Sequence, residues 1–156
     1  MTRPDCEPDL VPELLVSDVA TSVDFWCNAC GFEISYDRPD EGFAYVTRGR
    51  AHVMLEQRGA GRNWLTQELD PPFGRGVNFQ IGVRDLEPIL AALANAKWSL
   101  FMQPETKWYR VSGTEEAGVR QFLVTDPDGY LLRFQSSVGR RRAPACEGLD
   151  STQAEG

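Results

Sequence analysis

The sequence predicts an α+β fold made of two paired βαβββ modules, and two repeated features support that prediction. The segments Val-Ser-Asp-Val at 16–19 and Val-Arg-Asp-Leu at 83–86 each stand between a strand-like and a helix-like stretch. A β-rich stretch then closes each copy, with Met-Leu-Glu ending at Glu56 and Leu-Leu-Arg ending at Arg133. A duplicated module predicts two half-sheets that close around one shared cavity, with Glu56 and Arg133 at equivalent positions.

The first module spans residues 10–57. Its helix is expected to begin at Ser17 or Asp18, since either side chain can cap a helix N-terminus, and to run to Ala29. Gly31 follows, and a glycine just beyond a helix favours its termination. Strands separated by turn-like segments are expected at 11–16, 32–36, 43–47 and 51–57.

The second module spans residues 77–138 and repeats this order after a linker over 58–76. Its helix is expected over 86–96. The segment Asp-Pro-Asp-Gly at 126–129 suits a tight hairpin turn between the last two strands. Strands are expected at 77–83, 98–102, 107–111, 118–125 and 130–135. The linker contains Trp64 and Leu65, which predicts that it is ordered against another part of the chain.

Residues 10–138 are thus expected to form a single domain between two polar ends. The Pro-rich segment 1–9 predicts a flexible arm, and residues 139–156 predict a disordered tail because few apolar side chains are available to bury. Three arginines near the start of this tail either remain solvated or bind an acidic partner.

Net charge narrows the class of partner. The 156-residue chain carries 23 acidic and 16 basic residues, so its net charge is −7 and its pI is about 4.7. Nucleic acid is therefore not expected as a partner, whereas a cationic small molecule would be attracted. No apolar run reaches the ~20 residues that a membrane span needs, and the first residues lack the apolar core of a signal peptide. We expect a cytoplasmic protein that binds no membrane.

The chain has four cysteines and one histidine. Cys27 and Cys30 have the spacing of a redox motif, but they continue the apolar face of the first helix, so core packing is the favoured interpretation. Cys6 and Cys146 fall in the polar ends. His52 has no evident partner in the sequence, and no catalytic residues are predicted.

A polar face of the sheets is the predicted site. Residues two apart in a strand point to the same face, and the apolar face of each sheet is expected beneath the helices. The other face then carries Glu13, Met54, Glu56, Asn78, Gln80, Leu131 and Arg133. If the sheets curve, this face lines a ligand cavity, and if they stay open, it is a solvated surface.

Two stretches resemble bleomycin-resistance proteins of the vicinal oxygen chelate superfamily, which also contains the glyoxalases. One covers residues 11–32 and includes Val-Pro-Glu-Leu-Leu-Val-Ser-Asp-Val and Ser-Val-Asp-Phe-Trp, and the other covers residues 120–134. The resemblance extends over about residues 10–138. It implies cup-shaped mixed sheets, the vicinal oxygen chelate fold, and a homodimer whose pockets take residues from both chains. Pro12 stands where family members exchange their first strand between subunits, or it merely protects an edge strand.

The resemblance also bears on cofactors. Metal-dependent members carry His or Glu at positions that fall here on Val11, Glu56, Asn78 and Arg133. Only Glu56 can ligate a transition metal well, since valine has no donor atom and arginine repels a dication. No metal and no other cofactor is therefore expected. Arg133 is instead expected to pair with Glu56 or Glu13, within one chain or across the dimer, either as part of the site or as a purely structural contact.

The predicted function is sequestration of a planar or cationic, antibiotic-like ligand such as bleomycin at a dimer-interface pocket. Flat aromatic side chains can stack on such a ligand, although core or interface packing is an equally open role for them. The predicted ligand-binding residues are Glu13, Met54, Glu56, Trp64, Asn78, Gln80, Trp108, Tyr109 and Arg133. Two other functions stay open. One is a lyase- or isomerase-like enzyme of the same superfamily that uses Glu13 or Glu56 as a base, and the other is a structural or regulatory dimer with a vestigial cavity.

Overall fold

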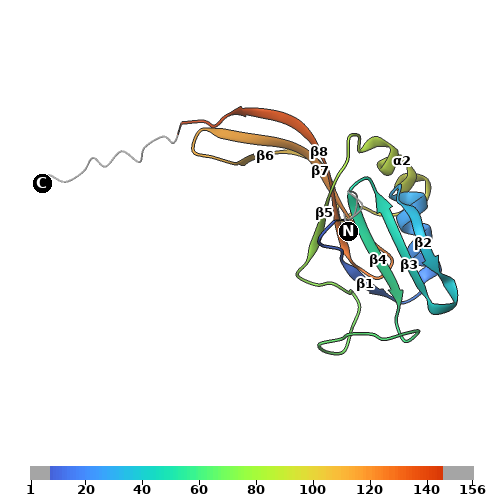
Figure 1. The fold of residues 1–156 in the computed structure, drawn as a ribbon. Helices are drawn as coiled ribbons and strands as arrows, with labels where there is room; N and C mark the ends of the chain where they lie inside the picture. The colour runs from blue at the N-terminus through green and yellow to red at the C-terminus, as the bar shows by residue number, and fades with distance from the viewer. Residues whose placement is uncertain (1–7, 146–156) are drawn as a thin grey trace, which may run out of the picture.

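The computed structural model describes residues 8–145 and contains two four-stranded mixed sheets, one from each module (Figure 1). Sheet A comprises, in the order β1-β4-β3-β2, the strands β1 (Glu13–Val16), β2 (Glu33–Arg38), β3 (Phe43–Arg48) and β4 (Ala51–Gln57). Sheet B comprises, in the order β5-β8-β7-β6, the strands β5 (Asn78–Gly82), β6 (Met102–Arg110), β7 (Glu115–Thr125) and β8 (Leu131–Arg142). In each sheet the first and last strands of the module pair in parallel, and the other pairs are antiparallel. This duplication confirms the predicted α+β fold class.

The two modules also match in register. Glu56 lies opposite Leu15, the third residue of β1, and Arg133 lies opposite Gln80, the third residue of β5. The equivalence of Glu56 and Arg133 that the sequence predicts is therefore confirmed.

The helices lie close to their predicted positions. The helix α1 (Val19–Asp24) continues into a π-helical turn, η1 (Phe25–Ala29), and α2 (Glu87–Asn95) is the helix of the second module. A short 3-10 turn, η2 (Pro39–Glu41), joins β2 to β3. Of the two candidate caps of α1, Asp18 acts as the cap, because its carboxylate accepts a hydrogen bond from the Ala20 N–H at 3.0 Å.

Both modules contribute to one apolar core. Its largest fully buried side chains include Trp26, Leu55, Leu86, Leu93, Phe122, Leu132 and Phe134. Phe25 of η1 packs against Trp98 of the second module, with ring centroids 5.0 Å apart. Cys30 is buried in this core and Cys27 packs against it, both as free thiols. The interpretation of the two cysteines as core residues is therefore confirmed.

A buried carboxylate joins the two modules at the β7–β8 turn. Asp126 is 2% exposed, and its Oδ2 accepts a hydrogen bond from the indole N–H of Trp26 at 3.3 Å. Its Oδ1 accepts from the backbone N–H groups of Asp128 and Tyr130, both at 2.9 Å. Burial raises the pKa of Asp126 to about 6, although these hydrogen bonds oppose the rise. The turn therefore connects the first helix to the second sheet.

The prediction of separate strands at 98–102 and 107–111 is wrong, because the single strand β6 replaces them. Trp98 turns inward, where its indole N–H donates to a carbonyl of β7 at 2.9 Å. The chain joins the sheet only at Met102 and continues past Pro104, where the register with β7 shifts. A proline, which has no backbone N–H, is tolerated there because an irregular position in an edge strand needs no such donor.

The prediction of disorder from residue 139 onward is wrong for the first four residues, because β8 continues to Arg142. Together with β6 and β7, this part of β8 forms an arm that projects from the body of the molecule (Figure 1). Arg141 pairs with Glu116 of β7 at 2.8 Å. Arg141, one of the arginines of the expected tail, therefore finds an acidic partner on the neighbouring strand, 25 residues away in sequence.

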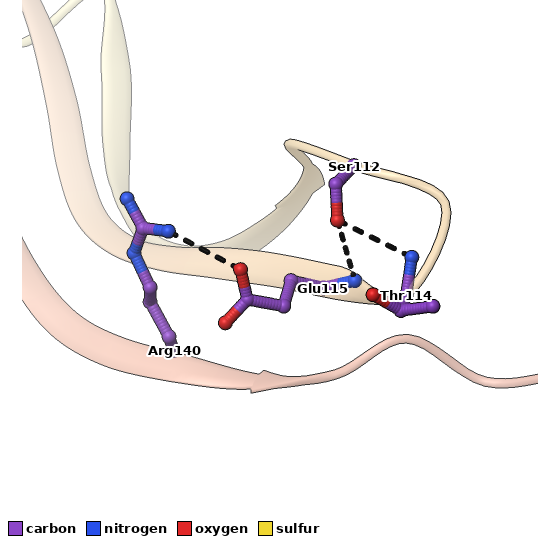
Figure 2. Close-up of polar contacts among 4 residues, drawn as sticks. All are labelled: Ser112, Thr114, Glu115 and Arg140. Atoms are coloured by element: carbon purple, nitrogen blue, oxygen red, sulfur yellow. Dashed lines mark hydrogen bonds and ion pairs between the residues drawn. The ribbon is translucent and has the colours of Figure 1, made fainter.

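Polar contacts also close the tip of the arm, as Figure 2 shows. Arg140 pairs with Glu115 at 3.4 Å across the β7–β8 ladder. The hydroxyl of Ser112 accepts hydrogen bonds from the backbone N–H groups of Thr114 and Glu115, at 3.3 and 3.1 Å. These bonds fix the turn between β6 and β7 without help from an apolar core.

The two chain ends are described only in part. Residues 1–7 and 146–156 lie outside the described residues, and with them most of the predicted arm and tail, Cys6 and Cys146. Within residues 8–145, no helix has the length and apolar character required to cross a membrane.

The linker is ordered, as its apolar residues predict, but through Phe73, since Trp64 is 75% exposed. Phe73 is 2% exposed and lies against Tyr130, with ring centroids 6.2 Å apart. Gly129 permits this close approach. Its φ is +100°, and a Cβ added there would lie 2.4 Å from the Cβ of Pro72.

We expect Gly129→Ala to lower the free energy of unfolding by about 2 kcal/mol, from left-handed backbone strain and the clash with Pro72. Gly139→Ala is the matched control, because its φ is +110° but nothing lies within 4 Å of the added Cβ. This control is expected to cost about 1 kcal/mol, from backbone strain alone. Urea denaturation measures both variants, and equal losses would contradict the close contact between linker and turn.

Candidate functional site

The open face of sheet A, opposite the face that packs on the helices, is the best-formed candidate site. Strand register sets its side chains in two rows. The rows are Glu13, Met54, Tyr45 and Tyr36, and then Leu15, Glu56, Phe43 and Arg38. The predicted residues Glu13, Met54 and Glu56 are thus neighbours on one face, as strand alternation indicates.

This face also carries an aromatic cluster that the predicted site does not include. Tyr36 and Tyr45 are stacked, with ring centroids 5.0 Å apart and an interplanar angle of 20°. The Tyr45 hydroxyl and Nδ1 of His52 form a hydrogen bond of 2.8 Å, so the expectation that His52 has no partner is wrong. The guanidinium of Arg38 lies 4.0 Å from the centroid of the Phe43 ring. Strand alternation indicates this cluster only once the β3–β4 register is known.

One end of the face forms a pocket of about 330 Å³. Its lining residues are Glu13, Arg38, Phe43, Glu56, Arg62 and Trp64. Three of the predicted ligand-binding residues, Glu13, Glu56 and Trp64, therefore meet here, although Trp64 comes from the linker and not from a strand. Because the Trp64 ring is 75% exposed, one side of it is available to a ligand.

Two carboxyl groups in this pocket share a hydrogen bond. The bond from Glu13 to Glu56, followed by burial and the negative charge of Glu56, raises the pKa of Glu13 to about 7. At neutral pH the pair therefore holds one proton for part of the time and loses it readily to solvent or to a base. Gly61 leaves room for the pair, because a Cβ added there would lie 2.9 Å from Oε1 of Glu56.

The open face of sheet B holds other predicted residues in a separate cluster. Nη2 of Arg133 donates to Oε1 of Gln80 at 2.7 Å, and Nε of Arg133 is buried without a hydrogen-bond partner in the described part of the chain. The predicted pairing of Arg133 with Glu56 or Glu13 within one chain is therefore wrong. The glutamates belong to sheet A, and the nearest polar side chain across the β5–β8 ladder is Gln80. Asn78 is exposed at the start of β5.

A buried glutamine organises the same face. Gln121 is 3% exposed, and its amide donates to the Tyr109 hydroxyl at 2.7 Å and to Oε1 of Glu105 at 3.1 Å. Its own Oε1 is buried and accepts no hydrogen bond from residues 8–145. Tyr109 belongs to the predicted site, whereas Gln121 and Glu105 are absent from it. The polar residue Gln121 beside Phe122 in a strand is the signal that indicates a second, non-core face.

Trp108 lies apart from both of these clusters. As the neighbour of Tyr109 in β6, it points to the opposite face of the sheet. There the guanidinium of Arg141 lies 4.2 Å from the centroid of its ring. A Cβ added at Gly118 would lie 2.8 Å from the same ring, so the indole fills the space that this glycine leaves.

The donor set does not fit a transition metal. Of the positions that metal-dependent members use, Val11 offers no donor atom and Arg133 brings a positive charge. Throughout residues 8–145, no three His, Cys, Asp or Glu side chains are grouped in a way that would hold a metal ion. Glu13 and Glu56 alone supply too few ligands for a transition metal.

Comparison with known proteins agrees with this fold. The profile of the Glyoxalase/Bleomycin resistance protein/Dioxygenase superfamily matches residues 10–134. A bleomycin resistance protein from Geobacillus stearothermophilus is 24% identical over 137 residues, which cover 82% of this chain and 96% of that protein.

Solved structures give matches of similar extent. The structure of TioX from Micromonospora sp. ML1 has a TM-score of 0.60 and 21% identity, and the match covers 81% of this chain and 96% of that one. A glyoxalase/bleomycin resistance protein/dioxygenase superfamily member from Vibrio splendidus 12B01 is 38% identical over 81% of this chain and 95% of that one, with a TM-score of 0.37. The profile match begins just before β1 and ends within β8, so it takes in both modules. The chain therefore belongs to the Glyoxalase/Bleomycin resistance protein/Dioxygenase superfamily.

Proposed function

We propose that this protein sequesters a small organic molecule that has a planar part and a cationic or amide-rich part, and that it does so without a metal ion. The pocket of sheet A is the observation that supports this function most, because it joins the Glu13–Glu56 pair to the exposed ring of Trp64. The similarity to bleomycin resistance proteins makes a bleomycin-like antibiotic the first ligand to test.

The chemistry of the pocket suits such a ligand. The two carboxyl groups accept hydrogen bonds from a protonated amine, and the rings of Trp64 and Phe43 offer flat surfaces for stacking. Arg38 is paired with Glu41 at 2.6 Å, so the positive charge of this lining residue is already offset. The guanidinium of Arg62, the other arginine of the lining, can donate to amide carbonyl groups of the ligand.

We expect metal-free bleomycin, which has a planar bithiazole and a cationic tail, to bind with a Kd in the micromolar range. Trp64→Ala is expected to weaken this binding about fivefold, because aromatic stacking contributes about 1 kcal/mol. Isothermal titration calorimetry measures the affinity of each variant directly.

Trp108→Ala is the matched control for that titration, because Trp108 lies on the other face of β6 under Arg141. Its affinity is expected to equal that of the wild-type protein. Equal losses in the two variants would contradict the assignment of the pocket, and no binding at millimolar concentration would exclude bleomycin as the ligand.

We also propose a homodimer that covers the open faces of both sheets. A single chain leaves aromatic side chains exposed on these faces, Tyr36 of sheet A at 48% and Tyr109 of sheet B at 40%. The pairing of Arg133 with Glu56 or Glu13 across this dimer stays a prediction, and it would satisfy the Nε of Arg133, which is buried without a hydrogen-bond partner in residues 8–145. Light scattering is expected to give twice the chain mass of 17.5 kDa, and a monomer at micromolar concentration would contradict the dimer.

The raised pKa of Glu13 favours one second candidate function, an enzyme that uses this carboxylate as a general base. A base with a pKa near neutrality is matched to proton abstraction at physiological pH. Proton NMR in D2O can follow hydrogen exchange in a panel of small hydroxy and keto compounds. Exchange with the wild-type protein but not with Glu13→Gln would favour the enzyme. If the protein showed neither bleomycin binding nor hydrogen exchange, a structural dimer would be favoured. The cytoplasmic location expected from the sequence stays a prediction.

A further inference from the structure

A second and larger cleft lies where the two modules meet. Its volume is about 1100 Å³, and its walls are the β3–β4 turn, the end of β5 with the loop that follows, and the part of β8 where the arm begins. The pocket of sheet A lies at the other end of the β3–β4 hairpin. Phe43, which lines that pocket, and Arg48, which lines the cleft, stand at opposite ends of β3. At about 3.4 Å per residue, roughly 17 Å separate these two ends.

The charge of this cleft is opposite to that of the whole protein. Three arginines line it, Arg48, Arg50 and Arg84, and Asp85 is the one carboxylate among its lining residues. The chain as a whole has a net charge of −7. A positive cleft in an acidic protein attracts anions to that place.

Within the described part of the chain, these guanidinium groups have no acidic partners. Arg50 and Arg84 form no hydrogen bond or ion pair within residues 8–145, and the one hydrogen bond of Arg48 in that range goes from Nε to the carbonyl of Cys30 at 3.2 Å. Elsewhere on the surface, arginines take carboxylates, as Arg120 does with Glu87 at 2.7 Å. Residues 8–145 thus leave most N–H donors of these arginines to a ligand.

Within residues 8–145, the acidic residue of the cleft, Asp85, forms no ion pair with these arginines. Oδ1 of Asp85 accepts a hydrogen bond from the backbone N–H of Glu87 at 3.0 Å, where the carboxylate holds the first turn of α2. Uncharged hydrogen-bonding groups complete the lining, among them Gln135 and Ser137 of β8. Guanidinium groups bind phosphate and carboxylate oxygens through paired N–H donors, and amide and hydroxyl groups add further bonds to the same oxygens.

We propose that this arginine cleft, lined by Arg48, Arg50 and Arg84, is a second ligand site that binds a small molecule with several negative charges on phosphate or carboxylate groups. The site is independent of the pocket proposed above, since none of the lining residues of the two is shared. Its volume is large enough for an organic anion of the size of typical ligands as well as for a simple oxyanion.

Calorimetric titration with pyrophosphate and with citrate, at constant ionic strength, tests the proposal. At least one of the two probes is expected to bind with a Kd below 1 mM, and their ratio distinguishes phosphate from carboxylate ligands. Arg50→Gln/Arg84→Gln is expected to weaken that binding at least tenfold, because two charged donors are lost. Arg142→Gln, an exposed arginine of the arm outside the cleft, is the control and is expected to leave the affinity unchanged.

Two results would overturn the proposal. One is the absence of binding of both probes at 10 mM, as an assay limit well above the expected Kd, and the other is unchanged affinity in the double variant. Circular dichroism confirms that the double variant is folded, which both exposed side chains make expected. Glu13→Gln/Glu56→Gln is expected to bind the anion like the wild-type protein, so this proposal and the function proposed for the pocket of sheet A succeed or fail separately.

Discussion

Asp126→Ala is expected to lower the free energy of unfolding by about 3 kcal/mol. The substitution removes the acceptor of three hydrogen bonds at the junction of the two modules. Two of the donors, the indole N–H of Trp26 and the backbone N–H of Tyr130, are then buried without an acceptor, at a cost of about 1–3 kcal/mol each. Relief from the burial of a charge offsets part of this loss. Chemical denaturation at pH 7 measures the result.

Asp128→Ala is the matched control in the same turn. The Asp128 carboxylate accepts hydrogen bonds from the N–H and hydroxyl of Ser17, but these contacts lie at the surface. Its loss is expected to cost about 1 kcal/mol. If Asp126→Ala were no more destabilising than Asp128→Ala, the buried carboxylate would not be the connection between the modules.

The pH dependence of stability gives a second readout of the same residue. The folded-state pKa of Asp126, about 6, lies above its ordinary value of 3.8, so the folded protein holds the proton more tightly than the unfolded chain does. The stability that this proton contributes is present in full below about pH 4 and is lost as the pH rises through 6. The wild-type protein is therefore expected to lose stability relative to Asp126→Asn over this range. The comparison removes the effect of Glu13, which titrates in the same direction.

Most of the fold follows from local patterns, and the exceptions depend on contacts distant in sequence. Strand alternation, the repeated Val-x-Asp opening and the cap at Asp18 are local, and they predict the module order and both helices. The inward turn of Trp98 depends on its contact with Phe25, and the continuation of β8 depends on Glu116 meeting Arg141. Such pairings follow from strand register, which alternation alone does not specify.

The candidate site likewise combines residues that local patterns predict with residues that they do not predict. Alternation places Glu13 and Glu56 on one face, and the parallel register of β1 with β4 makes their rows adjacent. It also separates Trp108 from Tyr109, because neighbours in a strand point to opposite faces, although both are among the predicted ligand-binding residues. The contribution of Trp64 is not a strand property, because a linker of this length can reach many places on the surface. Asp126 reads in the sequence as an ordinary turn residue, and only burial beside Trp26 reveals its role.

Glu13→Gln/Glu56→Gln is expected to weaken the binding of metal-free bleomycin about a hundredfold, which corresponds to about 2.8 kcal/mol. Both carboxyl groups line the pocket, and each would otherwise accept a charge-assisted hydrogen bond from a cationic ligand. Glutamine keeps the size of the side chains, so the pocket is expected to retain its shape. Calorimetry at pH 8, where the wild-type pair is largely ionised, gives the largest difference between the two proteins.

The pH profile of the same titration distinguishes a carboxyl pair from two independent acids. Because the pKa of Glu13 is raised to about 7 by its hydrogen bond to Glu56, affinity for a cation is expected to increase as the pH rises from 6 to 8. In Glu56→Gln the negative neighbour is gone, so Glu13 is expected to ionise at lower pH and the profile to be flat over this range. Carboxyl carbon shifts followed by NMR report the same titration without any ligand. A midpoint near 4.5 in the wild-type protein would show that the two groups share no proton, and a pH-independent affinity would then remove the pair from the binding mechanism.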